Sequence, residues 1–266
     1  MADWQATFGT AHPVALITGS AAPRLGRCTA EQLAERGFRL AIHANRSQSA
    51  GAALVAEFAQ QGVEAIAVCG DLTDEQAARQ IVHQVCEHFG RIDVLVNSAA
   101  IWEAKPLEQV TAEDLRRHLE VNVVGSFLCA QEAGLRMVAQ PTGGVIVNLG
   151  DWAIARPYLN YAAYFPSKGS IPAMTRSLAV ELASRNSKIR VNAVAPGPVT
   201  LPPEMPPHER QAAVDGTLLK REGSPEHVAH AILFLIENEY VTGVCLPVDG
   251  GRTVCTTDGS VNPDEM

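Results

Sequence analysis

Short runs of apolar, often β-branched residues recur along this chain of 266 residues, separated by longer amphipathic stretches. Several runs, such as Val-Ala-Leu-Ile and Gly-Val-Ile-Val, are apolar throughout and do not alternate with polar residues. A strand without alternation buries both of its faces, which is typical of a parallel sheet covered by helices on each side. The pattern therefore predicts a single doubly wound α/β domain with about seven strands.

The expected strands are residues 14–18, 39–43, 65–69, 94–96, 144–149, 190–194 and 244–248. The expected helices are residues 25–36, 48–61, 74–89, 112–139, 161–184 and 225–237. These elements place the domain at residues 14–252, with an N-terminal tail (1–13) and a C-terminal tail (253–266) that we expect to be poorly structured. A proline-rich, irregular insertion follows the sixth strand, and we interpret its residues 198–223 as a substrate lid.

Charge and composition exclude several classes of function. The net charge of −8 argues against a surface for nucleic acid or anionic membrane, and no segment is long and apolar enough to span a bilayer. The six cysteines are scattered without a CxxC pair, and the histidines lack metal-ligand spacing. We therefore expect a cytoplasmic protein without disulfides or a metal site.

The turn after the first expected strand has the features of a phosphate-binding loop. Glycine allows the backbone to approach a phosphate, and the N-terminus of the following helix attracts the anion. An arginine in the turn adds a positive charge beside a pyrophosphate. The residues of this turn predicted to bind a dinucleotide are Thr18, Gly19, Ser20, Arg24, Leu25 and Gly26.

The end of the second expected strand indicates which dinucleotide is bound. An NAD site usually has Asp or Glu here for the ribose 2′-hydroxyl, but no acid occurs before Glu57. Arg46 and Ser47 suit a 2′-phosphate instead, although Arg46 can also be a solvated strand-end residue. The segment therefore favours NADPH, with His43, Asn45, Arg46 and Ser47 on its adenosine side. Asp71 and Leu72, after the third strand, are expected near the adenine.

Tyr164 and Lys168 are four residues apart on one expected helix and therefore share a face. An ammonium beside a phenol stabilises the phenolate and lowers the pKa of the phenol toward that of a general acid. Asp151 lies thirteen residues before the tyrosine. Its carboxyl group can carry a proton, or it can be structural and accept backbone N–H groups near the sheet edge.

Together these motifs resemble the short-chain dehydrogenase/reductase family, which has a Rossmann-type fold. The resemblance covers residues 14–252 and includes Asn97-Ser98-Ala99-Ala100, Pro196-Gly197 and Val248-Asp249-Gly250-Gly251. It implies that Tyr164 donates a proton, that Lys168 holds the nicotinamide ribose, and that Asn122 supports a proton-relay water. It also implies cofactor contacts from Asn97, Ala99, Pro196 and Gly197, and a homotetramer built through the two long central helices.

A narrower similarity is to pteridine reductases and dihydromonapterin reductases, in which an Asp replaces the usual Ser at the place of Asp151. In that group the Arg of the first turn also contacts the pterin, so Arg24, Trp102, Asp151 and Tyr164 are expected to bind substrate. Trp102 can stack on a flat heterocycle or pack in the core or under the lid.

The leading hypothesis is therefore NADPH-dependent reduction of a pteridine C=N bond. The alternative is a carbonyl reductase resembling 3-oxoacyl-carrier-protein reductases, in which Asp151 only orients the carbonyl. A regulatory protein that binds NADP(H) without turnover is a third, weaker hypothesis.

Overall fold

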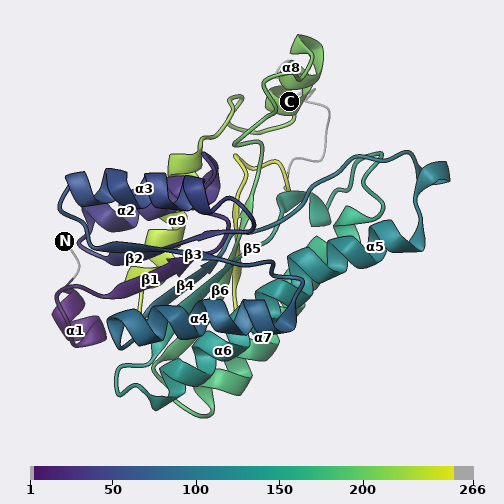
Figure 1. Ribbon diagram of the computed structural model, residues 1–266. Helices are drawn as coiled ribbons and strands as arrows, with labels where there is room; N and C mark the ends of the chain where they lie inside the picture. The colour runs from purple at the N-terminus through teal and green to yellow at the C-terminus, as the bar shows by residue number, and fades with distance from the viewer. Residues whose placement is uncertain (1–2, 255–266) are drawn as a thin grey trace.

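The computed structural model describes residues 3–254 of the chain. Seven strands form one parallel sheet in the order β3-β2-β1-β4-β5-β6-β7. Figure 1 shows this sheet between its covering helices. The strands are β1 (Val14–Ile17), β2 (Arg39–Ala44), β3 (Ala65–Cys69), β4 (Val94–Asn97), β5 (Gly144–Leu149), β6 (Ile189–Pro196) and β7 (Cys245–Val248). The strand order reverses between β1 and β4, and a sheet of this kind binds ligands at the carboxyl ends of its strands near that point. The predicted fold class is confirmed.

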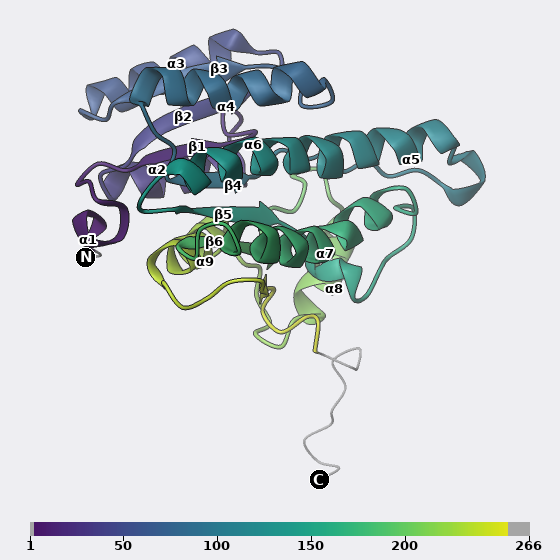
Figure 2. The same cartoon turned by 90° about the horizontal axis from the view of Figure 1, so that it is seen from below.

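Helices cover both faces of the sheet. The helices are α1 (Trp4–Phe8), α2 (Leu25–Glu35), α3 (Gln48–Gln60), α4 (Glu75–Phe89), α5 (Ala112–Leu119), α6 (Gly125–Ala139), α7 (Tyr164–Ala183), α8 (Pro207–Asp215) and α9 (Pro225–Glu237). Helices α2, α3 and α9 lie on one face, and α4, α6 and α7 on the other (Figures 1 and 2). Each layer buries its own apolar cluster against the strands. Because helices cover both faces, a strand without alternation such as β1 is fully buried, and all four of its residues are inaccessible.

The expectation of an unstructured N-terminal tail is wrong. Residues 4–8 form helix α1, which Asp3 caps by accepting a hydrogen bond from the Ala6 N–H. Trp4 and Phe8 are buried, and the Trp4 ring lies edge-on to Phe38 at 5.0 Å. Two aromatic side chains one helical turn apart therefore provide enough apolar burial to fix a very short helix against the domain. Most of the C-terminal tail, from residue 255, lies outside the described residues.

Two long segments differ in detail from the expectation. The single helix expected at 112–139 is interrupted by one π-helical turn, Glu120–Val124, which separates α5 from α6. In Figure 2, α5 and α6 form a long rod whose α5 end projects beyond the sheet. The insertion after β6 is not wholly irregular, because it contains α8, which starts at Pro207, a residue suited to the first turn of a helix.

Candidate active site

Asp151 and Tyr164 meet at the carboxyl edge of the sheet. Asp151 follows β5 by two residues, and Tyr164 is the first residue of α7. The Tyr164 hydroxyl donates to Oδ2 of Asp151 at 2.6 Å. The other carboxylate oxygen, Oδ1, accepts from the Ala153 N–H at 2.8 Å and caps a short 3-10 helix, Trp152–Ile154. Oδ1 therefore has the structural role considered for Asp151, while Oδ2 accepts the hydrogen bond of Tyr164.

The two groups of this pair share an environment that favours their protonated forms. Burial raises the pKa of Asp151, although the hydrogen bond from Tyr164, the Ala153 N–H and the charge of Lys168 oppose the change. Burial also raises the pKa of Tyr164, and the charge and hydrogen bond of Asp151 raise it further. The expected lowering of the tyrosine pKa is therefore wrong for this structure. The main cause is burial, and the second is that the phenol pairs with a carboxylate rather than with the lysine ammonium.

Lys168 lies one turn along α7, with only 5% of its surface exposed. Its Nζ donates to the Leu149 carbonyl oxygen at 2.7 Å, which ties the helix to the end of β5. Burial lowers the pKa of Lys168 to about 8, against the opposing charge of Asp151. The ammonium is therefore held at the strand end, close to the Asp151–Tyr164 pair.

Asn122 occupies the π-helical turn and is almost fully buried. Its Oδ1 accepts from the Ile101 N–H (2.8 Å), and its Nδ2 donates to the Ile101 carbonyl (3.0 Å). The same Nδ2 donates to Oγ of Ser167 (2.9 Å), which in turn donates to the Tyr164 carbonyl. Asn122 thus joins the loop after β4 to α7. Sequence reasoning missed Ser167, although its spacing of three residues from Tyr164 places it on the same side of the helix.

The turn after β1 has the backbone geometry expected of a phosphate loop. Gly19 has a positive φ of 68°, and a Cβ there would lie 2.9 Å from the Cα of Ala99. Thr18 is buried, and its Oγ1 accepts from the N–H groups of Ser98 and Ala99. Ser20 is also buried and donates to the Ile17 carbonyl. These residues build the turn, whereas Arg24 is exposed at the N-terminus of α2, which it starts without a side-chain cap. Leu25 and Gly26 follow as the first residues of that helix.

His43 was expected near the adenosine, but its side chain is engaged in the fold. The residue is only 1% exposed. Its Nδ1 accepts from the Gly19 N–H at 3.0 Å, and Nε2 faces the Gly70 carbonyl at 2.9 Å. Burial lowers the pKa of His43, which favours the neutral ring that this arrangement requires. The ring connects the phosphate turn to the end of β3 and positions the loop from inside.

The other residues of the adenosine segment reach the surface. The Arg46 guanidinium is 87% exposed and lies 3.7 Å from Oδ2 of Asp71. Ser47 caps α3 by accepting from the Ala50 N–H. Asn45 is exposed, whereas Leu72 is buried and packs against Gly125. The exposed Arg46 guanidinium is therefore available, at the end of β2, to bind an anionic group.

Asn97, at the end of β4, and Gly197, directly after β6, help to hold the strand ends together at the carboxyl edge of the sheet. Asn97 is buried and donates to the Ser126 carbonyl and to Oδ1 of Asn148, while its own Oδ1 has no protein partner. Gly197 follows Pro196 and donates its N–H to Val248; a Cβ there would lie 2.4 Å from the Cα of Asp249. Only glycine fits this close approach between the ends of β6 and β7.

Trp102 is neither a core residue nor freely solvated. It is 42% exposed, and its ring stacks on Tyr161 with the centroids 4.9 Å apart. The indole N–H donates to the Tyr158 hydroxyl at 3.1 Å. Neither Tyr158 nor Tyr161 could be selected from the sequence, because their contacts with Trp102 form only in the fold.

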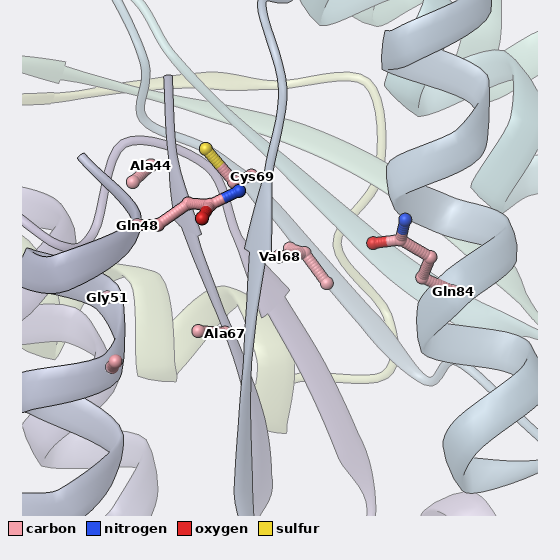
Figure 3. A pocket seen from close by; sticks show the side chains of 8 residues that line it. Ala44, Gln48, Gly51, Ala67, Val68, Cys69 and Gln84 are labelled. Atoms are coloured by element: carbon pink, nitrogen blue, oxygen red, sulfur yellow. The ribbon is translucent and has the colours of Figure 1, made fainter. Parts of the chain in front are cut away.

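A separate cavity of about 350 Å³ lies at the β3 edge of the sheet, between α3 and the strand. Figure 3 shows Gln48 of α3 reaching toward Cys69, with Gln84 of α4 on the other side of the strand that carries Val68. The residues lining the cavity do not include the Asp151–Tyr164 pair, so it is not the catalytic centre.

Between residues 3 and 254, no group of His, Cys, Asp or Glu is placed to hold a metal ion. None of the helices in that range is long and apolar enough to cross a membrane.

A doubly wound sheet with a glycine-bearing turn after β1 and a Tyr–Lys pair at its carboxyl edge defines an α/β oxidoreductase that uses a nicotinamide dinucleotide. A family model described as Enoyl-(Acyl carrier protein) reductase matches residues 20–253. A putative ketoacyl reductase of the granaticin polyketide synthase from Streptomyces violaceoruber is 36% identical over 92% of this chain and 98% of its own. Human 3-oxoacyl-[acyl-carrier-protein] reductase is 35% identical over 85% of this chain and 92% of its own.

Solved structures also share this fold. A blue fluorescent protein from a metagenomic library, solved in complex with NADPH, has a TM-score of 0.82 and 33% identity over 90% of this chain and 97% of its own. The chain belongs to the short-chain dehydrogenase/reductase family and is an NAD(P)-dependent oxidoreductase.

Proposed function

We propose that the protein is an NADPH-dependent carbonyl reductase acting on a ketone of the 3-oxoacyl type. The observation that carries the proposal is the buried Tyr164 hydroxyl at the carboxyl edge of the sheet, one helical turn from the buried ammonium of Lys168. The ketoacyl reductases among the relatives support a carbonyl substrate. They support it better than the pteridine substrate favoured by the sequence alone.

The residues present fit the proposed cofactor. Gly19 allows the backbone approach that a pyrophosphate needs, and Arg24 stands at a helix N-terminus without a side-chain cap. The exposed Arg46, with no acid at the end of β2, suits a ribose 2′-phosphate. We propose that the Lys168 ammonium holds the nicotinamide ribose. When bound, NADPH supplies the hydride that reduces the carbonyl carbon and leaves as NADP⁺.

The chain's own contribution is to supply and hold the proton. Tyr164 donates its hydroxyl proton to the carbonyl oxygen, which completes the alcohol. Asp151 is the acceptor that orients the phenol in the resting site, and in its protonated form it can also donate to the carbonyl oxygen. The raised pKa of Asp151 keeps that form populated to higher pH than for an exposed carboxyl group. Asn122 holds the loop after β4 in place next to the pair.

One observation favours a second candidate function. An acid paired with the catalytic tyrosine provides two protonatable groups, which suits a C=N heterocycle such as a dihydropterin. The part-exposed Trp102 offers a flat face for it. The carbonyl function remains our main proposal because ketoacyl reductases are among the relatives of this chain.

The experiment that tests the proposal measures NADPH oxidation with a 3-oxoacyl thioester, dihydrobiopterin and dihydrofolate side by side. Turnover of the thioester alone, or at least tenfold faster than the pterins, is the expected result. Faster turnover of a pterin would overturn the carbonyl proposal. Tight NADPH binding without turnover of any carbonyl or pterin would favour a regulatory protein instead.

The variant Asp151→Ser separates the two candidate functions through its pH profile. A carbonyl enzyme should keep or gain activity, because a serine hydroxyl can also donate to the carbonyl oxygen, and its rate should lose the dependence on the Asp151 pKa. A pterin enzyme should lose activity at every pH. Asp74→Ser, which removes an exposed carboxylate at the N-terminus of α4 while serine can still cap that helix, is the matched control.

We also propose a cytoplasmic homotetramer. Apolar side chains remain exposed on the long helices of one face, among them Phe127 and Leu135 of α6 and Val180 of α7. Light scattering coupled to size-exclusion chromatography should give four times the chain mass, and a monomer would refute this proposal.

A further inference from the structure

Aromatic side chains gather beside the catalytic pair to an unusual degree. The chain has only three tryptophans and four tyrosines. Two of those tryptophans and three of those tyrosines lie within one network of ring contacts around Tyr164. We call its non-catalytic members the aromatic wall, which consists of Trp102, Trp152, Tyr158, Tyr161 and Phe165. With Tyr164, the wall holds six of the chain's fourteen aromatic residues.

The wall is assembled by two loops and the start of α7. Tyr158 is at its centre: its ring lies edge-on to Tyr161 at 5.0 Å and nearly parallel to Trp152 at 6.5 Å. Its hydroxyl accepts the indole N–H of Trp102. Phe165, directly after the catalytic tyrosine, lies edge-on to Tyr158 at 4.9 Å. These contacts fix the orientation of rings that come from loops.

The wall is continuous with the reacting groups. The Tyr161 ring is 6.2 Å from that of Tyr164. Burial raises the pKa of Tyr158, and the negative charge of Asp151 raises it further. The Asp151 carboxyl group is therefore near enough to this phenol to act on its charge. A molecule held against the wall would therefore have Tyr164 and Asp151 at its edge.

The wall is not part of the hydrophobic core. Trp102 is 42% and Tyr158 is 39% exposed, and neither belongs to the two buried clusters that support the sheet. By contrast, Trp4 is buried in the core. Large rings that are rigidly held yet open to solvent beside reacting groups are typical of a binding surface.

We infer that the aromatic wall selects a carbonyl group carried on a planar aromatic or conjugated ring system over one carried on a saturated chain or ring. The inference rests on the proposed carbonyl reduction and names its substrate class. A flat ring stacks on aromatic faces with its edge toward the catalytic pair, whereas a puckered saturated ring contacts them less fully. The reaction itself is unchanged: the carbonyl carbon gains a hydride and its oxygen gains a proton.

The test compares two ketones of equal carbon skeleton, ethyl benzoylacetate and its cyclohexyl analogue. The ratio of their kcat/KM values is measured for the unaltered protein and for Trp102→Leu and Tyr158→Leu. Each variant removes one ring of the wall, so the phenyl-to-cyclohexyl ratio should fall about two- to tenfold, the range of a single aromatic pair. Differences in the intrinsic reactivity of the two ketones cancel in the comparison between variants.

Two further variants serve as controls. Tyr158→Phe keeps the ring and removes only the hydroxyl, so it should retain most of the preference. Tyr240→Leu removes a 99% exposed tyrosine outside the wall and should leave the ratio unchanged. An equal loss on both ketones in Trp102→Leu, or an unchanged ratio in both wall variants, would overturn the inference. If neither ketone nor any other carbonyl compound is reduced, the proposed function itself fails.

Discussion

Replacing Asn122 by leucine should destabilise the protein as well as impair its activity. The substitution keeps a side chain of similar length but removes three hydrogen bonds of 2.8, 3.0 and 2.9 Å. It leaves the N–H and C=O of Ile101 and the Ser167 hydroxyl without that partner. A buried polar group left unpaired costs about 1–3 kcal/mol. Ile101 is only half-buried and Ser167 keeps its bond to Tyr164, so we expect a total of about 2–4 kcal/mol.

The assay is urea unfolding followed by circular dichroism, with thermal melting as a second measurement. For a domain of this size the loss corresponds to a fall in Tm of about 5–15 °C. Asn45→Leu, which changes an exposed asparagine, is the matched control and should shift the unfolding free energy by less than about 0.5 kcal/mol. A loss in Asn122→Leu as small as in this control would refute the argument that Asn122 supports the site structurally.

Two other predictions concern charged groups. Arg46→Ala should raise the KM for NADPH about tenfold or more and leave the KM for NADH nearly unchanged, because only NADPH has the 2′-phosphate; equal effects on both would contradict the adenosine-side assignment. Lys168 has a folded-state pKa of about 8, below its usual 10.5, so the unfolded chain binds more protons between these values. The free energy of unfolding should therefore contain a contribution that rises from about pH 8 to 10.5. The variant Lys168→Met should lose this contribution, whereas the control Lys220→Met, which changes an exposed lysine, should keep it. Identical pH profiles for the two variants would contradict the prediction.

The fold was predictable because its signal is local and repeated. Seven apolar runs with intervening amphipathic stretches determine a covered parallel sheet, and the boundaries of β3 and β5 were predicted to the residue. Helix α1 was missed because five residues provide too little periodicity. Its evidence is the Asp3 cap and the pair Trp4 and Phe8, whose burial depends on the distant Phe38.

The residues that we propose as catalytic were selected from the sequence, but their contacts were not predictable from it. Spacing alone places Tyr164 and Lys168 on one helix, yet it does not show that the phenol pairs with Asp151 and that the ammonium donates to the Leu149 carbonyl. The pKa of the tyrosine is raised by its burial and by its contact with Asp151, neither of which the spacing shows, and its direction was therefore mispredicted. The contacts of His43 were not predictable for the same reason, since its two ring partners, Gly19 and Gly70, come from other strand ends. The aromatic wall joins residues from separate loops and has no local pattern.

The most direct test of the central claim is turnover by Tyr164→Phe with the best carbonyl substrate. This change removes the hydroxyl proton and the hydrogen bond to Asp151 but keeps the ring and its packing. The account predicts that kcat falls by about 10²–10⁴ while NADPH binding, followed by fluorescence titration, is retained. A variant that binds NADPH and turns over at the rate of the unaltered protein would contradict the assignment of Tyr164 as the proton donor.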